Sequence, residues 1–156
     1  MNTAMEKIDY SNKDGERDPL TGKIIEACYH VHNELGPGFV ERIYMNALKI
    51  ALEKQKLIFT AETEFVVRYA EQPIGKFRAD LLVENKVIVE LKAVEGKMPK
   101  IFESQIISYL KASDIKVGLL VNFGNRSCEI RRLMIKNDYR DKKQDYNDSK
   151  KITAIF

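Results

Sequence analysis

The sequence predicts an α+β domain in which helices flank a mixed β-sheet. Three observations predict this class: two amphipathic helical patterns come first, three strand patterns follow, and a helix then leads to a short, nearly apolar strand. Strands that follow one another closely pair in antiparallel fashion, and a further strand reached through a helix completes a mixed sheet. The predicted element order is α-α-β-β-β-α-β.

Both predicted N-terminal helices have an apolar stripe on one face. Gly36-Pro37-Gly38 ends the first helix, because glycine suits a helix cap and proline cannot continue the hydrogen-bond ladder. The second helix extends to about Lys56, and Glu41 lies one turn before Tyr44, at the edge of its stripe. The stripes consist of Leu20, Ile24, Ala27, Cys28, Val31 and Leu35 in the first helix, and of Tyr44, Ala47, Leu48, Ala51 and Leu52 in the second.

β-Branched and aromatic residues predict three consecutive strands, at residues 64–69, 76–83 and 87–94, with a turn at residues 72–75. A helix is then predicted at residues 101–112, with inward positions Ile101, Ile106, Tyr109 and Leu110 and with Gln105 beside them. The nearly apolar residues 116–123 predict a strand that is buried on both faces. Residues 127–134 predict a further edge strand.

Length and composition indicate one domain with polar ends. The chain has 156 residues, 44% of them hydrophobic and 31% charged, and its net charge of +3 neither requires nor excludes a nucleic-acid partner. We predict a flexible arm at residues 1–17, a domain at residues 18–135 and a charged, poorly ordered tail at residues 136–156.

The sequence favours a cytoplasmic protein without membrane contact. No run approaches the roughly 20 apolar residues of a membrane helix. The polar N-terminus lacks the apolar stretch of a signal peptide. Cys28 and Cys128 form no CxxC pair, which favours two reduced thiols.

Asp80, Glu90 and Lys92 form the pattern that carries chemistry. Side chains alternate between the faces of a strand, so Glu90 and Lys92 share one face of the third strand. If Glu84-Asn85-Lys86 is a three-residue loop, the paired residue numbers sum to 170 and Asp80 lies opposite Glu90. A two-residue loop would place Asp80 on the other face, so the site depends on this turn.

A divalent cation would resolve the repulsion between these two opposed carboxylates. Mg²⁺ takes oxygen ligands and keeps several waters. Bound to Asp80 and Glu90, it could polarise a phosphoryl oxygen and lower the pKa of its water. The Lys92 ammonium would then orient the attacking water or neutralise charge on the phosphate.

Other interpretations of these residues stay open. Asp80, Glu90 and Lys92 could be a solvated strand face, with Glu90–Lys92 and Arg78–Asp80 as mutual ion pairs. The basic residues could line a phosphate track or form a solvated rim. They are Lys76, Arg78, Lys97, Lys100, Arg126, Arg131 and Arg132.

Five segments together resemble a known family. Residues 38–44 have the form GxxExxY, and the other segments are residues 78–83, residues 88–93, residues 105–112 and residues 117–124. This joint pattern closely resembles the GxxExxY proteins, a branch of the PD-(D/E)XK nuclease superfamily, over roughly residues 20–133. The usual Pro-Asp dipeptide is Ala79-Asp80 here.

The resemblance implies a restriction-endonuclease-like α-β-β-β-α-β core and a set of roles. Asp80, Glu90 and the backbone carbonyl of Leu91 would bind the metal, and Glu41 would add a carboxylate. Lys92 would serve the nucleophilic water, and Gln105 would steady the site.

We therefore expect an enzyme, a Mg²⁺- or Mn²⁺-dependent nuclease that acts on DNA. The alternative is a catalytically silent module of the same fold that binds nucleic acid or a protein partner. Many relatives act as dimers, so a homodimer is a further expectation.

Overall fold

The structure, a computed structural model, describes residues 18–135. The predicted arm at residues 1–17 and the predicted tail at residues 136–156 lie outside the described residues. Within residues 18–135, no helix is both long enough and apolar enough to cross a membrane.

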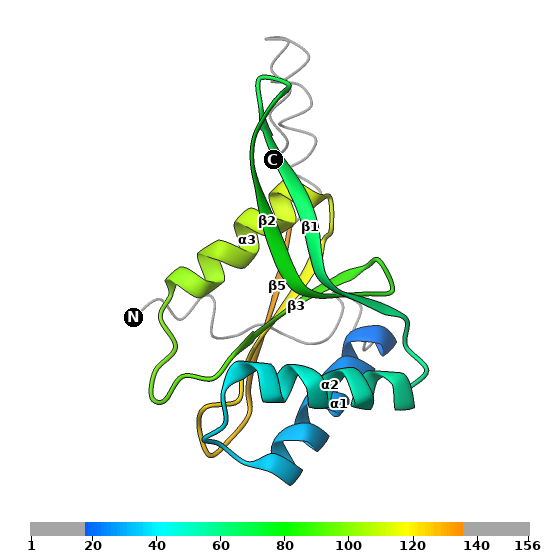
Figure 1. The fold of residues 1–156 in the computed structure, drawn as a ribbon, viewed down its shortest axis with the longest axis vertical. Coiled ribbons are helices and arrows are strands. Elements are labelled where there is room, and N and C mark those ends of the chain that lie inside the picture. Colours follow the sequence, from blue (N-terminus) through cyan, green and yellow to red (C-terminus); the bar gives the residue numbers. More distant parts are fainter. Residues whose placement is uncertain (1–17, 136–156) are drawn as a thin grey trace.

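The described chain forms one five-stranded sheet and three helices (Figure 1). In chain order the elements are α1 (Pro19–Leu35), α2 (Glu41–Lys54), β1 (Phe59–Tyr69), β2 (Gln72–Val83), β3 (Val87–Lys92), α3 (Ile101–Ser113), β4 (Val117–Asn122) and β5 (Glu129–Met134). The strands lie side by side in sequence order, and only the β3–β4 pair is parallel. The predicted mixed sheet, element order and fifth edge strand are thus confirmed.

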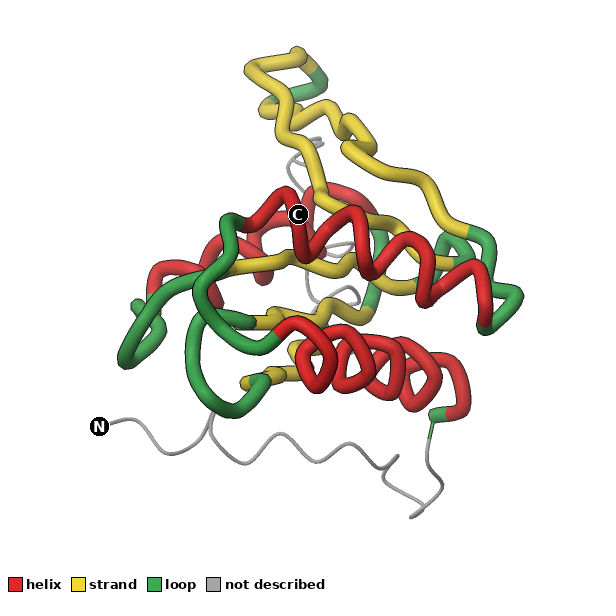
Figure 2. The backbone as a smooth tube through the Cα atoms, turned by 60° about the horizontal axis from the view of Figure 1, so that its bottom comes forward, coloured by secondary structure: helices red, strands yellow, loops and turns green. Residues whose placement is uncertain are grey.

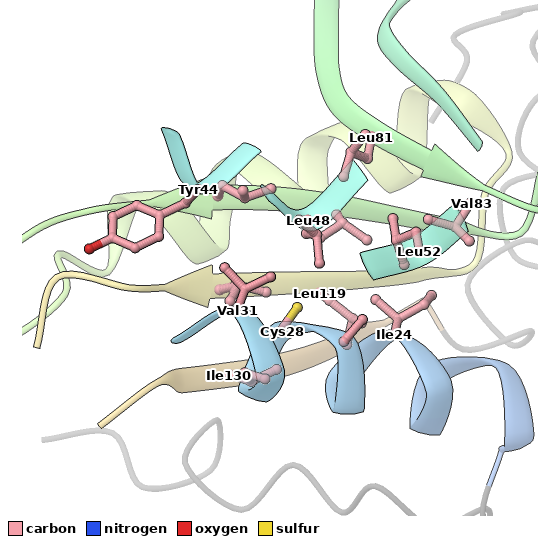
Figure 3. Packing of buried hydrophobic residues seen from close by; sticks show 14 of the residues in the cluster. Ile24, Cys28, Val31, Tyr44, Leu48, Leu52, Leu81, Val83, Leu119 and Ile130 are labelled. Atoms are coloured by element: carbon pink, nitrogen blue, oxygen red, sulfur yellow. The ribbon is translucent and has the colours of Figure 1, made fainter. Parts of the chain in front are cut away.

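Helices cover both faces of the sheet, and each face has its own apolar core (Figure 2). Buried residues of α1 and α2 pack against one face, where Ile24, Leu48 and Leu119 are all fully buried (Figure 3). On the other face, α3 places Ile106 and Leu110 against Ile88. Gly118 permits this close packing, because a Cβ there would lie 2.6 Å from the Ile106 Cγ2.

The turn predicted at residues 72–75 is wrong, because these residues belong to β2. The two strands are joined instead by Ala70 and Glu71, both with positive φ. This is the geometry of a tight two-residue hairpin. Pro73 pairs next to an irregularity at Val67/Arg68, the kind of position where a sheet tolerates proline.

β1 begins five residues earlier than predicted, and its hairpin with β2 changes faces near Glu62. Ala61 and Leu81 pack on the α1–α2 side, whereas Phe65 and Ala79 pack on the α3 side. Glu62 has a φ of 54°, and its register position lies opposite Asp80. Beyond this point the hairpin projects past the helices (Figures 1 and 2).

Candidate metal and catalytic site

Asp80 and Glu90 lie where β2 and β3 separate. The β2–β3 pairing runs from Val83↔Val87 to Leu81↔Val89, so the register predicted from a three-residue loop is confirmed. At the next position, that of Asp80 and Glu90, hydrogen bonds to side chains take the place of hydrogen bonds between the two backbones. The Glu90 Oε1 accepts a hydrogen bond from the Asp80 N–H at 2.9 Å, and the Asp80 Oδ2 accepts one from the Leu91 N–H at 2.8 Å.

The loop that sets this register contains two left-handed residues. Glu84 and Asn85 have φ values of 52° and 54°, and the Lys86 N–H donates to the Val83 carbonyl at 3.0 Å. We expected a left-handed residue at Asn85, which tolerates this conformation. Glu84 adopts it as well, and its Oε1 accepts a hydrogen bond from the Ile58 N–H at 2.9 Å, beside β1.

Burial opposes the ionisation of Asp80 and Glu90. Glu90 is 5% exposed, and desolvation together with the charge of Asp80 raises its pKa from 4.5 to about 8. Burial also raises the pKa of Asp80, although the Leu91 N–H and the charge of Lys92 oppose the rise. Without a cation, the pair therefore keeps a proton at neutral pH.

Lys92 is half-buried beside the two carboxyl groups. Its charge lowers the pKa values of Asp80, Glu90 and Glu41, which places the ammonium in their common field. The Nζ lies 4.3 Å from the centre of the Phe102 ring on α3, a cation–π contact that fixes its position. Within residues 18–135, the structure forms neither the Glu90–Lys92 nor the Arg78–Asp80 ion pair of the alternative interpretation.

Glu41 is the first residue of α2 and lines one pocket with Asp80 and Leu91. Burial and the charge of Asp80 raise its pKa, and Lys92 opposes the rise. The loop before α2 is held by Tyr44, whose hydroxyl donates to the Gly36 carbonyl at 2.5 Å and accepts from the Phe39 N–H at 3.2 Å.

Glycine, glutamate and tyrosine of the GxxExxY segment thus have separable tasks. Gly38 has a φ of 112°, a conformation that favours glycine. Tyr44 is fully buried and stacks on Phe123 with ring centres 4.7 Å apart. Together they fix the start of α2, where Glu41 and its neighbour Arg42 line the pocket that also contains Asp80.

Gln105 lies on an exposed part of α3 and contacts the site through Tyr109. Burial and the charges of Glu90 and Asp80 raise the pKa of Tyr109, whereas a hydrogen bond with Gln105 lowers it. The Tyr109 ring stacks on Phe77 of β2 at 4.2 Å. The helical pattern predicted Tyr109 only as an apolar inward position. The signal was its spacing of four residues from Gln105, which places both on one helix face.

Two of the basic residues left open by the sequence have structural partners. Arg131 forms ion pairs with the buried Glu103 of α3 and with Glu129, the latter at 3.0 Å. Arg132 is 4% exposed and lies 3.7 Å from the Asp18 carboxylate. Neither is placed to line a solvent-facing phosphate track.

Ile101, expected to point inward, is 67% exposed, and Glu103 is buried instead.

The donor set fits a hard divalent cation. Within the described residues no group of three or more His, Cys, Asp or Glu side chains stands together as a metal site. The set here is a carboxylate pair with the Leu91 backbone beside it and Glu41 in the adjoining pocket. Mg²⁺ usually needs only one or two carboxylates, because it keeps several waters.

One family model and one solved structure are similar to this chain. The model of the PD-(D/E)XK nuclease superfamily matches residues 18–133. Among solved structures, the chain is similar to the crystal structure of a protein called SSO0001, with 19% identity and a TM-score of 0.47. The match covers 64% of this chain and 52% of that one, so this chain spans about half the length of that protein. No curated protein matches.

Proposed function

Because the chain belongs to the PD-(D/E)XK nuclease superfamily, we propose that it is a divalent-metal-dependent nuclease that hydrolyses phosphodiester bonds in DNA. The observation that carries the proposal is the meeting of Asp80 and Glu90 beside Lys92 where β2 leaves β3. A buried acid, a half-buried acid and an ammonium side by side are typical of a catalytic centre, because a structural core seldom keeps such groups.

Asp80, Glu90, the Leu91 carbonyl and Glu41 would hold Mg²⁺ or Mn²⁺. The cation, when bound, would polarise the phosphate and make a water more acidic. The protein's own contribution is orientation: the Leu91 N–H fixes one Asp80 oxygen, and the Asp80 N–H fixes one Glu90 oxygen. The cation would bind the remaining carboxylate oxygens in place of the side-chain hydrogen bond between Asp80 and Glu90.

Lys92 would bind the water or the phosphate. An ammonium donates hydrogen bonds in three directions and neutralises negative charge on the reacting group. Phe102 limits where this ammonium can lie. Gln105 and Tyr109 would act as positioning residues, since Tyr109 lies in the field of Asp80 and Glu90 and Gln105 bonds to Tyr109.

Membership of the GxxExxY branch is part of the proposal. It is supported by the division of tasks among Gly38, Glu41 and Tyr44, which accounts physically for each letter of that segment. A reducing cytoplasm as the working compartment is likewise proposed, because Cys28 and Cys128 are free thiols. A homodimer stays a prediction from the sequence.

A digestion panel tests the function directly. Purified protein is incubated with single- and double-stranded DNA and RNA, with Mg²⁺, with Mn²⁺ and with EDTA. We expect DNA cleavage that requires metal and is lost in Asp80→Ala and in Lys92→Ala, with circular dichroism spectra unchanged. Cleavage that survives both substitutions would refute the mechanism. DNA binding without cleavage under any metal would identify the alternative, a catalytically silent binding module.

A further inference from the structure

We infer that Arg42 and Lys49 of α2 bind two successive backbone phosphates of the substrate strand, next to the phosphate that is cleaved. Both side chains line the same pocket of about 210 Å³ as Asp80 and Glu41. The inference rests on the proposed function, because it takes Asp80 as the position of the reacting phosphate.

Helix geometry places the two cations in one row. Residues seven apart share a face of an α-helix, and at about 1.5 Å per residue they lie about 10 Å apart along its axis. Met45, between them, lines the same pocket. The row therefore leads away from Glu41, at the start of α2, along the helix that lies below the sheet in Figure 1.

The cations are available to a ligand. Arg42 lies 3.8 Å from the Glu62 carboxylate, but the two side chains are 69% and 60% exposed. An ion pair this exposed contributes little and yields readily to a better partner. Lys49 forms no ion pair within 4.0 Å in the part of the chain that the structure describes.

The charges of the pocket indicate a role for Arg42 and Lys49. The same pocket contains the carboxyl groups of Glu41, Glu62 and Asp80, which would repel a polyanion. Arg42 and Lys49 offset that repulsion on the α2 side, and guanidinium suits phosphate because it can donate two parallel hydrogen bonds. On the α3 side the site presents Tyr109 and Gln105, which are uncharged. The strand is therefore expected to leave the site along α2.

Salt-dependent DNA binding tests this role separately from cleavage. All variants carry Lys92→Ala, so that a labelled 20-base-pair duplex stays intact with Mg²⁺ present. Fluorescence anisotropy then gives the dissociation constant over a series of NaCl concentrations. Arg42→Ala and Lys49→Ala are compared singly and together. The matched control is Lys54→Ala, which removes the same charge from α2 but from the groove toward α1.

The plot of log affinity against log salt concentration has a negative slope. Each lost phosphate contact should reduce the magnitude of that slope by about 0.9. We expect the double variant to lose about 2 from this slope and about tenfold or more in affinity at physiological salt. Arg42→Lys should restore most of the slope, and Lys54→Ala should leave it unchanged. A purely structural role for these residues would not change the slope.

The inference is overturned if the double variant keeps the slope of its parent, if Lys54→Ala lowers it equally, or if the parent does not bind DNA. These outcomes differ from those of the digestion panel. Cleavage with an unchanged slope refutes the phosphate position and leaves the nuclease. A changed slope, together with no cleavage by the protein that keeps Lys92, refutes the proposed nuclease activity. It leaves a DNA-binding surface on α2.

Discussion

Glu90→Gln should stabilise the metal-free protein, although it removes a residue of the site. Glu90 is 5% exposed, and burial and Asp80 raise its pKa from 4.5 to about 8. Each unit of pKa corresponds to about 1.4 kcal/mol, so this rise costs folding at most about 5 kcal/mol at alkaline pH and about 3 kcal/mol at pH 7. Glutamine carries no charge, and its oxygen can still accept from the Asp80 N–H.

The sign follows from the direction of the pKa change. A group whose pKa is higher in the folded state stabilises that state at low pH, and this stability is lost as pH rises through the folded pKa. The wild-type free energy of unfolding should therefore fall between pH 5 and pH 8 relative to that of Glu90→Gln. Part of the difference belongs to the pair with Asp80, since the two carboxyls titrate together, so we expect about 2 kcal/mol at pH 7.

Urea unfolding of both proteins, in EDTA at pH 5, 6, 7 and 8, measures this difference. Glu95→Gln is the control, because it removes the same charge from an exposed position just beyond β3. Added Mg²⁺ should stabilise the wild type and reduce the advantage of Glu90→Gln, because a ligand stabilises only the state that binds it. A difference in unfolding free energy that does not change with pH would refute the argument that folding raises the pKa of Glu90.

Three further substitutions test the framework around the site, each by urea unfolding. Tyr44→Phe should cost about 1–2 kcal/mol, because it removes the hydroxyl that joins two backbone groups of the loop before α2, whereas Tyr29→Phe on the exposed face of α1 should change little. Gly124→Ala should cost about 3 kcal/mol or more, because its Cβ would lie 2.3 Å from the Val94 carbonyl oxygen; normal stability would contradict this close approach of the segment after β4 to the segment after β3. Gly22→Ala should instead stabilise α1 by about 0.5–1 kcal/mol, because its Cβ meets nothing within 4 Å; a loss of stability would contradict that open space.

The β2–β3 register was predicted on the condition that Glu84-Asn85-Lys86 is a three-residue loop, and the structure has that register. Two apolar runs flank this loop, but their residues are buried on both faces of the sheet, so the apolar pattern alone does not exclude a shift by one residue. Asn85 tolerates the left-handed backbone that the loop needs. The opposition of Asp80 and Glu90 followed from the assumed length of this loop.

The first hairpin could not be predicted in the same way. Its turn is Ala70-Glu71, two residues without a preference for positive φ, whereas Pro73 and Gly75 nearby are typical turn residues. The early start of β1 is also set by tertiary pairing, since Phe59 pairs with Val83 in the buried end of β2. Strand propensity is weak where such pairing decides.

The α3 part of the site was predicted only in part. Gln105 was placed beside the inward face, but the structure puts it on an exposed part of the helix, where it contacts Tyr109. Phe102, which holds Lys92, had no signal beyond its apolar character. The packing of α3 on the sheet brings Phe102 to Lys92, and no local pattern in the sequence indicated this contact.

Calorimetric titration with Mn²⁺ tests the central claim, that the carboxyls of Asp80 and Glu90 hold a divalent cation. The account predicts saturable binding by the wild type, with proton release near neutral pH because Glu90 must ionise to bind. Binding should be lost in Asp80→Asn and kept in Lys92→Ala, which leaves both carboxylates in place. Absence of binding by the wild type, or equal binding by Asp80→Asn, would contradict the account.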